Sequence, residues 1–193
     1  MPKMSGLETT FCRSALWRRF ARDVALPWSL QGQDVSGDVL ELGAGSGEMA
    51  AALLQRSPEV RLTLTDIDER MVATARDRFT RNPRPKVEQT DSTALHYADS
   101  SFDFVLSFLM LHHVVNWQPA VAEAARVLKP GGMLIGYDLT ASPAAKLLHL
   151  VDRSPHQLVQ PAELAPTARD IGLDVSIRTG WAGQVMRFLA RKC

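Results

Sequence analysis

Three glycines at alternate positions, Gly43, Gly45 and Gly47, are the residues whose spacing points most directly to chemistry. They follow the apolar run Val39–Leu42 and precede Met49–Leu54, where apolar residues repeat at helical spacing. A glycine turn between a strand and a helix lets the backbone approach a bound molecule where a Cβ atom would collide with it. The segment therefore predicts a site for a nucleotide-bearing cofactor.

Two classes of cofactor compete for this turn. The residues from Gly45 to Ala50 satisfy the dinucleotide fingerprint G-x-G-x-x-A, and Asp66 lies near the distance expected of a ribose-binding acid. Read from Glu41, the same turn is an acidic residue followed by three alternating glycines, which resembles the first motif of class I S-adenosylmethionine (SAM) dependent methyltransferases. The turn alone does not decide between them, because both folds place adenosine at the end of the first strand.

The order of elements favours the methyltransferase. Five predicted strands alternate with predicted helices, which calls for a parallel sheet in a three-layer α/β fold. These strands are Val39–Leu42, Arg61–Thr65, Lys86–Thr90, Phe102–Phe108 and Met133–Tyr137. Two alternating runs, Asp174–Thr179 and Gln184–Ala190, then surround Gly180–Gly183 and predict a hairpin. A methyltransferase sheet ends in such an antiparallel hairpin, whereas a plain dinucleotide fold has no need of one.

Further segments carry the resemblance. Thr65–Met71 resembles the segment after the second strand, whose acid binds both ribose hydroxyls, and Gln89–Ser92 resembles the adenine site. Ser101–Ser107 resembles the fourth-strand motif, and Ala125–Gly132 resembles the turn before the fifth strand in the ubiquinone/menaquinone-biosynthesis-like branch of small-molecule methyltransferases. The resemblance implies SAM as cofactor, bound by Glu41, Gly43, Ala44, Gly45, Gly47, Asp66, Ile67, Asp91, Ser92 and Ser107. An ordinary role remains open for two of them: Asp66 as a helix cap and Asp91 as a solvated turn residue.

The resemblance also implies the fold. We expect a Rossmann-like three-layer sandwich with a seven-stranded, mostly parallel sheet in the order 3-2-1-4-5-7-6 and an antiparallel last strand. One methyltransferase domain is expected over residues 1–193: an N-terminal helical cover (1–36), a cofactor-binding core (38–138), a variable substrate-side insertion (139–160), and a C-terminal helix and hairpin (161–193). Leu16, Phe20 and Val24 predict an amphipathic helix in the cover, and Pro166 is expected to interrupt the C-terminal helix.

Catalysis by a methyltransferase requires little covalent chemistry from the protein, which must align donor and nucleophile and exclude water. A hydroxyl or ammonium acceptor must also lose a proton, and histidine has a suitable pKa for a general base. His113 is the first candidate, His112 the second, and Asp138, at the end of the fifth strand, the third. Each can instead be structural. No spacing of these residues predicts a metal site.

The acceptor is expected between the N-terminal helix and the insertion. The apolar side chains available as walls, which can equally be ordinary packing, are Trp17, Phe20, Trp28, Leu147, Leu148 and Val151. The net charge of +1 gives no reason to expect a nucleic-acid partner. Two cysteines without metal-ligand spacing, and the lack of an apolar run near the ~20 residues of a membrane span, predict a soluble cytoplasmic protein.

The predicted function is SAM-dependent methyl transfer to a small-molecule acceptor by in-line attack on the sulfonium methyl group. Two alternatives remain. An NAD(P)-dependent oxidoreductase fits the glycine turn, but the sequence contains no Tyr-x-x-x-Lys pair. A SAM-binding regulatory protein without its own turnover would carry the same cofactor motifs. The identity of the acceptor and the oligomeric state stay open.

Overall fold

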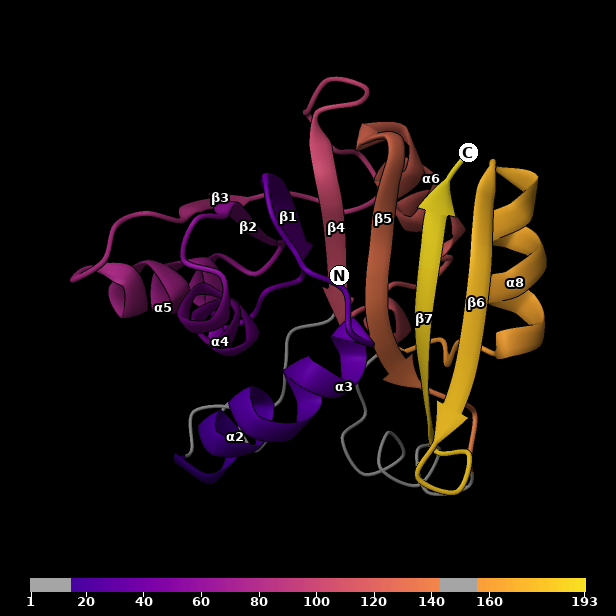
Figure 1. Ribbon diagram of the computed structural model, residues 1–193, viewed down its shortest axis with the longest axis horizontal. Coiled ribbons are helices and arrows are strands. Elements are labelled where there is room, and N and C mark those ends of the chain that lie inside the picture. The colour runs from indigo at the N-terminus through magenta and orange to yellow at the C-terminus, as the bar shows by residue number, and fades with distance from the viewer. Residues whose placement is uncertain (1–14, 143–155) are drawn as a thin grey trace.

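The computed structural model describes residues 15–142 and 156–193. Seven strands form one sheet in the order β3-β2-β1-β4-β5-β7-β6, in which β1 to β5 are parallel and β7 is antiparallel to both of its neighbours (Figure 1). The predicted strand order and antiparallel last strand are confirmed. The strands are β1 (Asp38–Leu42), β2 (Arg61–Asp66), β3 (Lys86–Gln89), β4 (Phe102–Phe108), β5 (Leu128–Leu139), β6 (Leu173–Gly180) and β7 (Val185–Lys192).

Helices cover both faces of the sheet. They are α2 (Ala15–Phe20), the π-helical turn η1 (Ala21–Ala25), α3 (Leu26–Leu30), α4 (Glu48–Arg56), α5 (Glu69–Phe79), the 3₁₀ turn η2 (Leu111–His113), α6 (Gln118–Val127) and α8 (Pro161–Asp170). Successive strand residues point to opposite faces, so Leu40 packs in an apolar cluster with α6 and α8, and Val39 packs in a second cluster with α3 and α4. The result is the expected three-layer sandwich.

The N-terminal cover departs from the predicted apolar stripe. Val24 is 43% exposed, whereas Ala21, Ala25 and Leu26 are buried. The reason is η1, which contains Val24. Its i→i+5 hydrogen bonds put more residues in each turn than the 3.6 of an α-helix, so Val24 no longer lies on the same face as Phe20. The prediction was therefore wrong at Val24, although a helical cover is present. In Figure 1, α2 and α3 lie at the end of the sheet toward which β5 and β6 point.

The C-terminal helix α8 continues through Pro166, so the predicted interruption was wrong. A proline in a helix lacks the amide that would bond the carbonyl four residues earlier and is unfavourable by about 3 kcal/mol. Two features offset this effect. A capping box between Gln160 and Glu163 stabilises the first turn, and Leu164 and Ala168 are buried against the sheet and α6.

The fifth strand begins earlier than predicted. Leu128 already pairs with Phe102, and a register shift follows before Met133 pairs with Phe104. Gly131, with φ of 78°, lies within this irregular start of β5. The segment Ala125–Gly132, which resembles the turn before the fifth strand, therefore ends α6 at Val127 and continues as the irregular start of β5. Over the residues that the structure describes, no helix combines the length and apolar character that crossing a bilayer requires.

Candidate functional site

The glycine turn joins β1 to α4, and its three glycines all have a positive φ, between 54° and 76°. Their surroundings differ. A Cβ atom on Gly43 would lie 2.0 Å from Cγ of Met110, and one on Gly47 would lie 2.9 Å from the ring of Phe79. A Cβ on Gly45 would meet no described atom within 4 Å. Gly43 and Gly47 therefore allow close internal packing, whereas Gly45 presents an open backbone face that a cofactor could approach.

Asp66, the last residue of β2, lies directly against this face. One carboxylate oxygen accepts the Gly45 amide at 2.8 Å, and the other accepts the Asp68 amide at 2.8 Å. Burial raises the pKa of Asp66, and these backbone hydrogen bonds oppose the rise. Ala44 is held to the same strand, since its amide donates to the Thr65 carbonyl at 2.9 Å. Each carboxylate oxygen keeps acceptor capacity, so the arrangement fits a pair of ribose hydroxyls.

Glu41 is a buried carboxyl beside the turn. The residue is 2% exposed, and among the described residues its Oε2 atom has no hydrogen-bond partner. Burial, together with the nearby charge of Asp66, raises the pKa of Glu41 to about 8. A buried acceptor without a donor is unfavourable in the protein alone. It fits a cationic ligand group such as the ammonium of SAM.

Asp91 and its neighbours lie at the end of β3. The Thr90 amide donates to the Asp66 carbonyl at 3.0 Å, which brings this end beside β2. Oδ1 of Asp91 accepts the amide of Thr93 at 2.8 Å and its hydroxyl at 2.7 Å, so this carboxylate does organise a local turn. Ser92 and Ile67 are both partly buried. The turn role and a contact with adenine are compatible, since the turn uses only one oxygen.

Ser107 lies near the end of β4, in register with Leu42 of β1 and Gly136 of β5. It is 1% exposed, and its hydroxyl has no hydrogen-bond partner within the described residues. A Cβ on Gly136 would lie 2.2 Å from the Ser107 carbonyl oxygen, so a glycine is required at the facing position. All the predicted cofactor residues thus gather at the carboxyl edge of β1 to β4.

Two of the three candidate bases, His112 and Asp138, are in direct contact. Nδ1 of His112 contacts Oδ1 of Asp138, and the His112 amide donates to Oδ2 at 3.3 Å. The side chain of His112 is 4% exposed and that of Asp138 is 0% exposed. The Leu139 amide donates to the Asp138 carboxylate at 2.7 Å. His113, the first candidate from the sequence, is partly exposed, and its ring centroid lies 4.0 Å from that of His112.

Phe20 and Trp28, two apolar side chains predicted to line the acceptor site, both contact Trp181, which the sequence analysis did not identify. Trp181, in the β6–β7 turn, stacks on Trp28 with centroids 5.5 Å apart and lies 5.8 Å from the ring of Phe20. Trp28 also meets Tyr137 edge-on at 5.7 Å. The feature of the sequence that could have indicated this contact is a large aromatic residue inside the short Gly180–Gly183 turn. The side chain of Trp17, and Leu147, Leu148 and Val151, lie outside the described residues.

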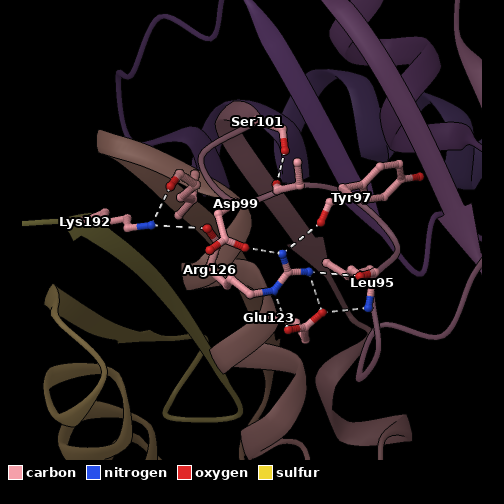
Figure 2. Close-up of polar contacts among 9 residues, drawn as sticks. Leu95, Tyr97, Asp99, Ser101, Glu123, Arg126 and Lys192 are labelled. Carbon is pink, nitrogen blue, oxygen red and sulfur yellow. Dashed lines mark hydrogen bonds and ion pairs between the residues drawn. The ribbon is translucent and has the colours of Figure 1, made fainter.

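A polar network around Arg126 fixes the connection between β3 and β4 (Figure 2). The guanidinium donates to the carbonyls of Leu95 and Tyr97 at 2.9 and 2.8 Å and pairs with Glu123 at 2.7 Å and Asp99 at 2.6 Å. Glu123 in turn accepts the Leu95 amide at 2.7 Å. The hydrogen bond from Arg126 lowers the pKa of Glu123, and the charge of Arg126 acts in the same direction. The segment that follows Asp91 is therefore anchored to α6.

This sheet order, with a glycine turn and acidic residues at its carboxyl edge, defines the class I methyltransferase architecture. The chain belongs to the methyltransferase domain family, whose model matches residues 40–136. Enzymes of this family use SAM as the methyl donor.

Relatives and solved structures agree with this assignment. The chain is 36% identical over 124 residues to the ubiquinone/menaquinone biosynthesis C-methyltransferase UbiE of Hydrogenovibrio crunogenus, covering 62% of this chain and 46% of that protein. It is 33% identical over 172 residues to the 27-O-demethylrifamycin SV methyltransferase of Amycolatopsis mediterranei, covering 79% of this chain and 63% of that protein. The chain thus spans about half the length of the first of these relatives. A SAM-dependent methyltransferase from Thermotoga maritima shares the fold, with a TM-score of 0.77, 22% identity and 96% of each chain covered.

Proposed function

We propose that this protein transfers a methyl group from SAM to a small-molecule acceptor. The observation that carries the proposal is the carboxylate of Asp66, held at 2.8 Å from the Gly45 amide beside the open backbone face of the turn. Asp66 would accept the ribose hydroxyls, and Asp91 the amine of adenine. Glu41 would hold the ammonium group together with the carbonyl of Ser107. When bound, SAM supplies an electrophilic methyl group on its sulfonium.

For an acceptor that must lose a proton, we assign the general base to His112. A carboxylate against Nδ1 keeps the proton on that nitrogen, so the lone pair of the neutral ring is on Nε2. His112 would take the acceptor proton at Nε2, and Asp138 would stabilise the imidazolium that forms. His113 is the second candidate, since its ring lies against that of His112.

The small-molecule class of acceptor rests on the relatives. The enzymes named above act in ubiquinone/menaquinone biosynthesis and on 27-O-demethylrifamycin SV, and both kinds of substrate are small molecules. The net charge of +1 supports the same class, since it gives no general attraction to nucleic acid. A cytoplasmic location stays a prediction.

The test is turnover with methyl-labelled SAM and a panel of phenols, quinols and hydroxylated macrocycles. We expect S-adenosylhomocysteine to form together with a product heavier by one methylene. His112→Gln should lose turnover and keep SAM binding, which separates the base from the cofactor site. SAM binding without turnover on any acceptor would support the regulatory alternative, and NAD binding would support the oxidoreductase.

A further inference from the structure

Arg78 reaches the glycine turn from the last turn of α5, which lies outside the segments that resemble methyltransferase motifs. Its Nε donates to the carbonyl of Ser46 at 2.6 Å, and its Nη2 pairs with the carboxylate of Glu48. Ser46 and Glu48 flank Gly47, so one guanidinium holds both sides of the third glycine. The Arg78 side chain is 22% exposed and that of Glu48 is 6% exposed.

Glu48 makes this contact a charged one. It is the first residue of α4, where a carboxylate interacts favourably with the helix dipole. Burial raises the pKa of Glu48, and the nearby charge of Arg78 opposes that rise, with a smaller contribution from Arg18 of α2. Without Arg78, the Glu48 carboxylate would be buried without its close partner.

The end of α5 also sets the position of the turn by packing. A Cβ on Gly47 would lie 2.9 Å from the ring of Phe79 and 3.5 Å from Cδ of Arg78. Within the described residues, the other hydrogen bonds of the turn run from the amides of Ala44, Gly45 and Gly47 to Thr65, Asp66 and Ala44, and from the Ala51 amide to the Gly47 carbonyl. None of them engages the carbonyl of Ser46, the residue between the open face of Gly45 and the packed Gly47.

We propose that Arg78 is a positioning residue for the cofactor. By fixing the Ser46 carbonyl and Glu48, it holds the Gly45 backbone in place against Asp66 before SAM arrives. The inference rests on the proposed function, since it concerns the same site. A preorganised site avoids the free energy of ordering it on binding. Removing the guanidinium should therefore raise the Kd and KM for SAM about tenfold and leave kcat at saturating SAM within about twofold.

The experiment compares Arg78→Met with Arg76→Met as a matched control. Arg76 lies on the same helix, but its guanidinium donates to the Val87 carbonyl at 3.0 and 3.2 Å, away from the turn. SAM affinity is measured by calorimetry, and amide hydrogen exchange compares residues 43–48 with strand β4. We expect weaker binding and faster exchange at the turn in Arg78→Met alone. Arg78→Lys should recover only part of the affinity, because an ammonium lacks the planar fork that serves two acceptors at once.

A double variant, Arg78→Met with Glu48→Gln, removes the unpaired carboxylate and is used if the single variant does not fold. Wild-type protein that fails to bind SAM would overturn the proposed function and this inference with it. Wild-type protein that binds SAM, together with an Arg78→Met variant of equal affinity and equal turn exchange, would overturn the inference alone. A fall in kcat with unchanged KM would overturn it as well.

Discussion

Replacing Glu41 by glutamine should stabilise the protein and weaken its cofactor site. The carboxyl has a pKa of about 8 in the folded protein, against an ordinary value of 4.5. Between these values the folded state holds a proton that the unfolded chain has released, so the free energy of unfolding falls as pH rises from 4.5 to about 8. At pH 7 the effect is at most about 3 kcal/mol, at roughly 1.36 kcal/mol for each pH unit. Glutamine has nearly the same size as glutamate, and its amide does not titrate in this pH range.

Urea unfolding across this pH range tests the effect. Glu41→Gln should exceed the wild-type free energy of unfolding by an amount that grows with pH and levels off above about 8. Glu59→Gln, on an exposed glutamate, should follow the wild-type curve. Identical pH dependence of the wild type and Glu41→Gln would show that the Glu41 carboxyl titrates in the folded protein as it does in the unfolded chain, contrary to this prediction.

The same residue makes a second, linked prediction about binding. An ammonium group placed beside Glu41 would lower the pKa of the carboxyl, so SAM binding near pH 7 should release a proton. Calorimetry in two buffers of different ionisation enthalpy measures that proton. Glu41→Gln should bind SAM more weakly and release none. Proton uptake by the wild type, or equal release by both proteins, would contradict the placement of the ammonium group.

Further variants test the other parts of the site. Asp66→Ala should weaken SAM binding by roughly 1.5–3 kcal/mol, because a charged acceptor is lost; calorimetric affinity within twofold of wild type would count against the ribose role. His112→Gln should lower kcat about 10²–10⁴-fold for an acceptor that loses a proton, with SAM affinity nearly unchanged. A comparable loss only in His113→Gln would move the base to His113. Arg126→Met should lower the free energy of unfolding by about 2 kcal/mol, because it removes the charged donor to the carbonyls of Leu95 and Tyr97 and leaves Glu123 with only the Leu95 amide; a urea midpoint equal to wild type would show that the network adds nothing.

The parts of the fold that follow from local pattern could be predicted. The alternation of strands and helices and the Gly180–Gly183 turn determine a parallel sheet with a terminal hairpin. Two errors arose where local rules were overridden. A π-helical turn shifts the register of the cover and exposes Val24, and burial of one side of α8 with a capping box outweighs Pro166.

The arrangement of the site could be predicted only in part. Glycine spacing and strand ends place Glu41 and Asp66 at one edge, because the carboxyl ends of parallel strands meet there. The choice between His112 and His113 depends on how a 3₁₀ turn orients adjacent side chains, which the sequence does not express. The contact of Arg78 with Ser46 joins residues 32 positions apart and depends on the packing of α5, so no motif contains it.

The identity of the cofactor is tested by a calorimetric titration of the wild-type protein with SAM and, separately, with NAD. The glycine turn, the carboxylate of Asp66 and the buried acceptor of Glu41 predict binding of SAM with micromolar-scale affinity and no binding of NAD. Heat with NAD and none with SAM would contradict the assignment of SAM as the cofactor.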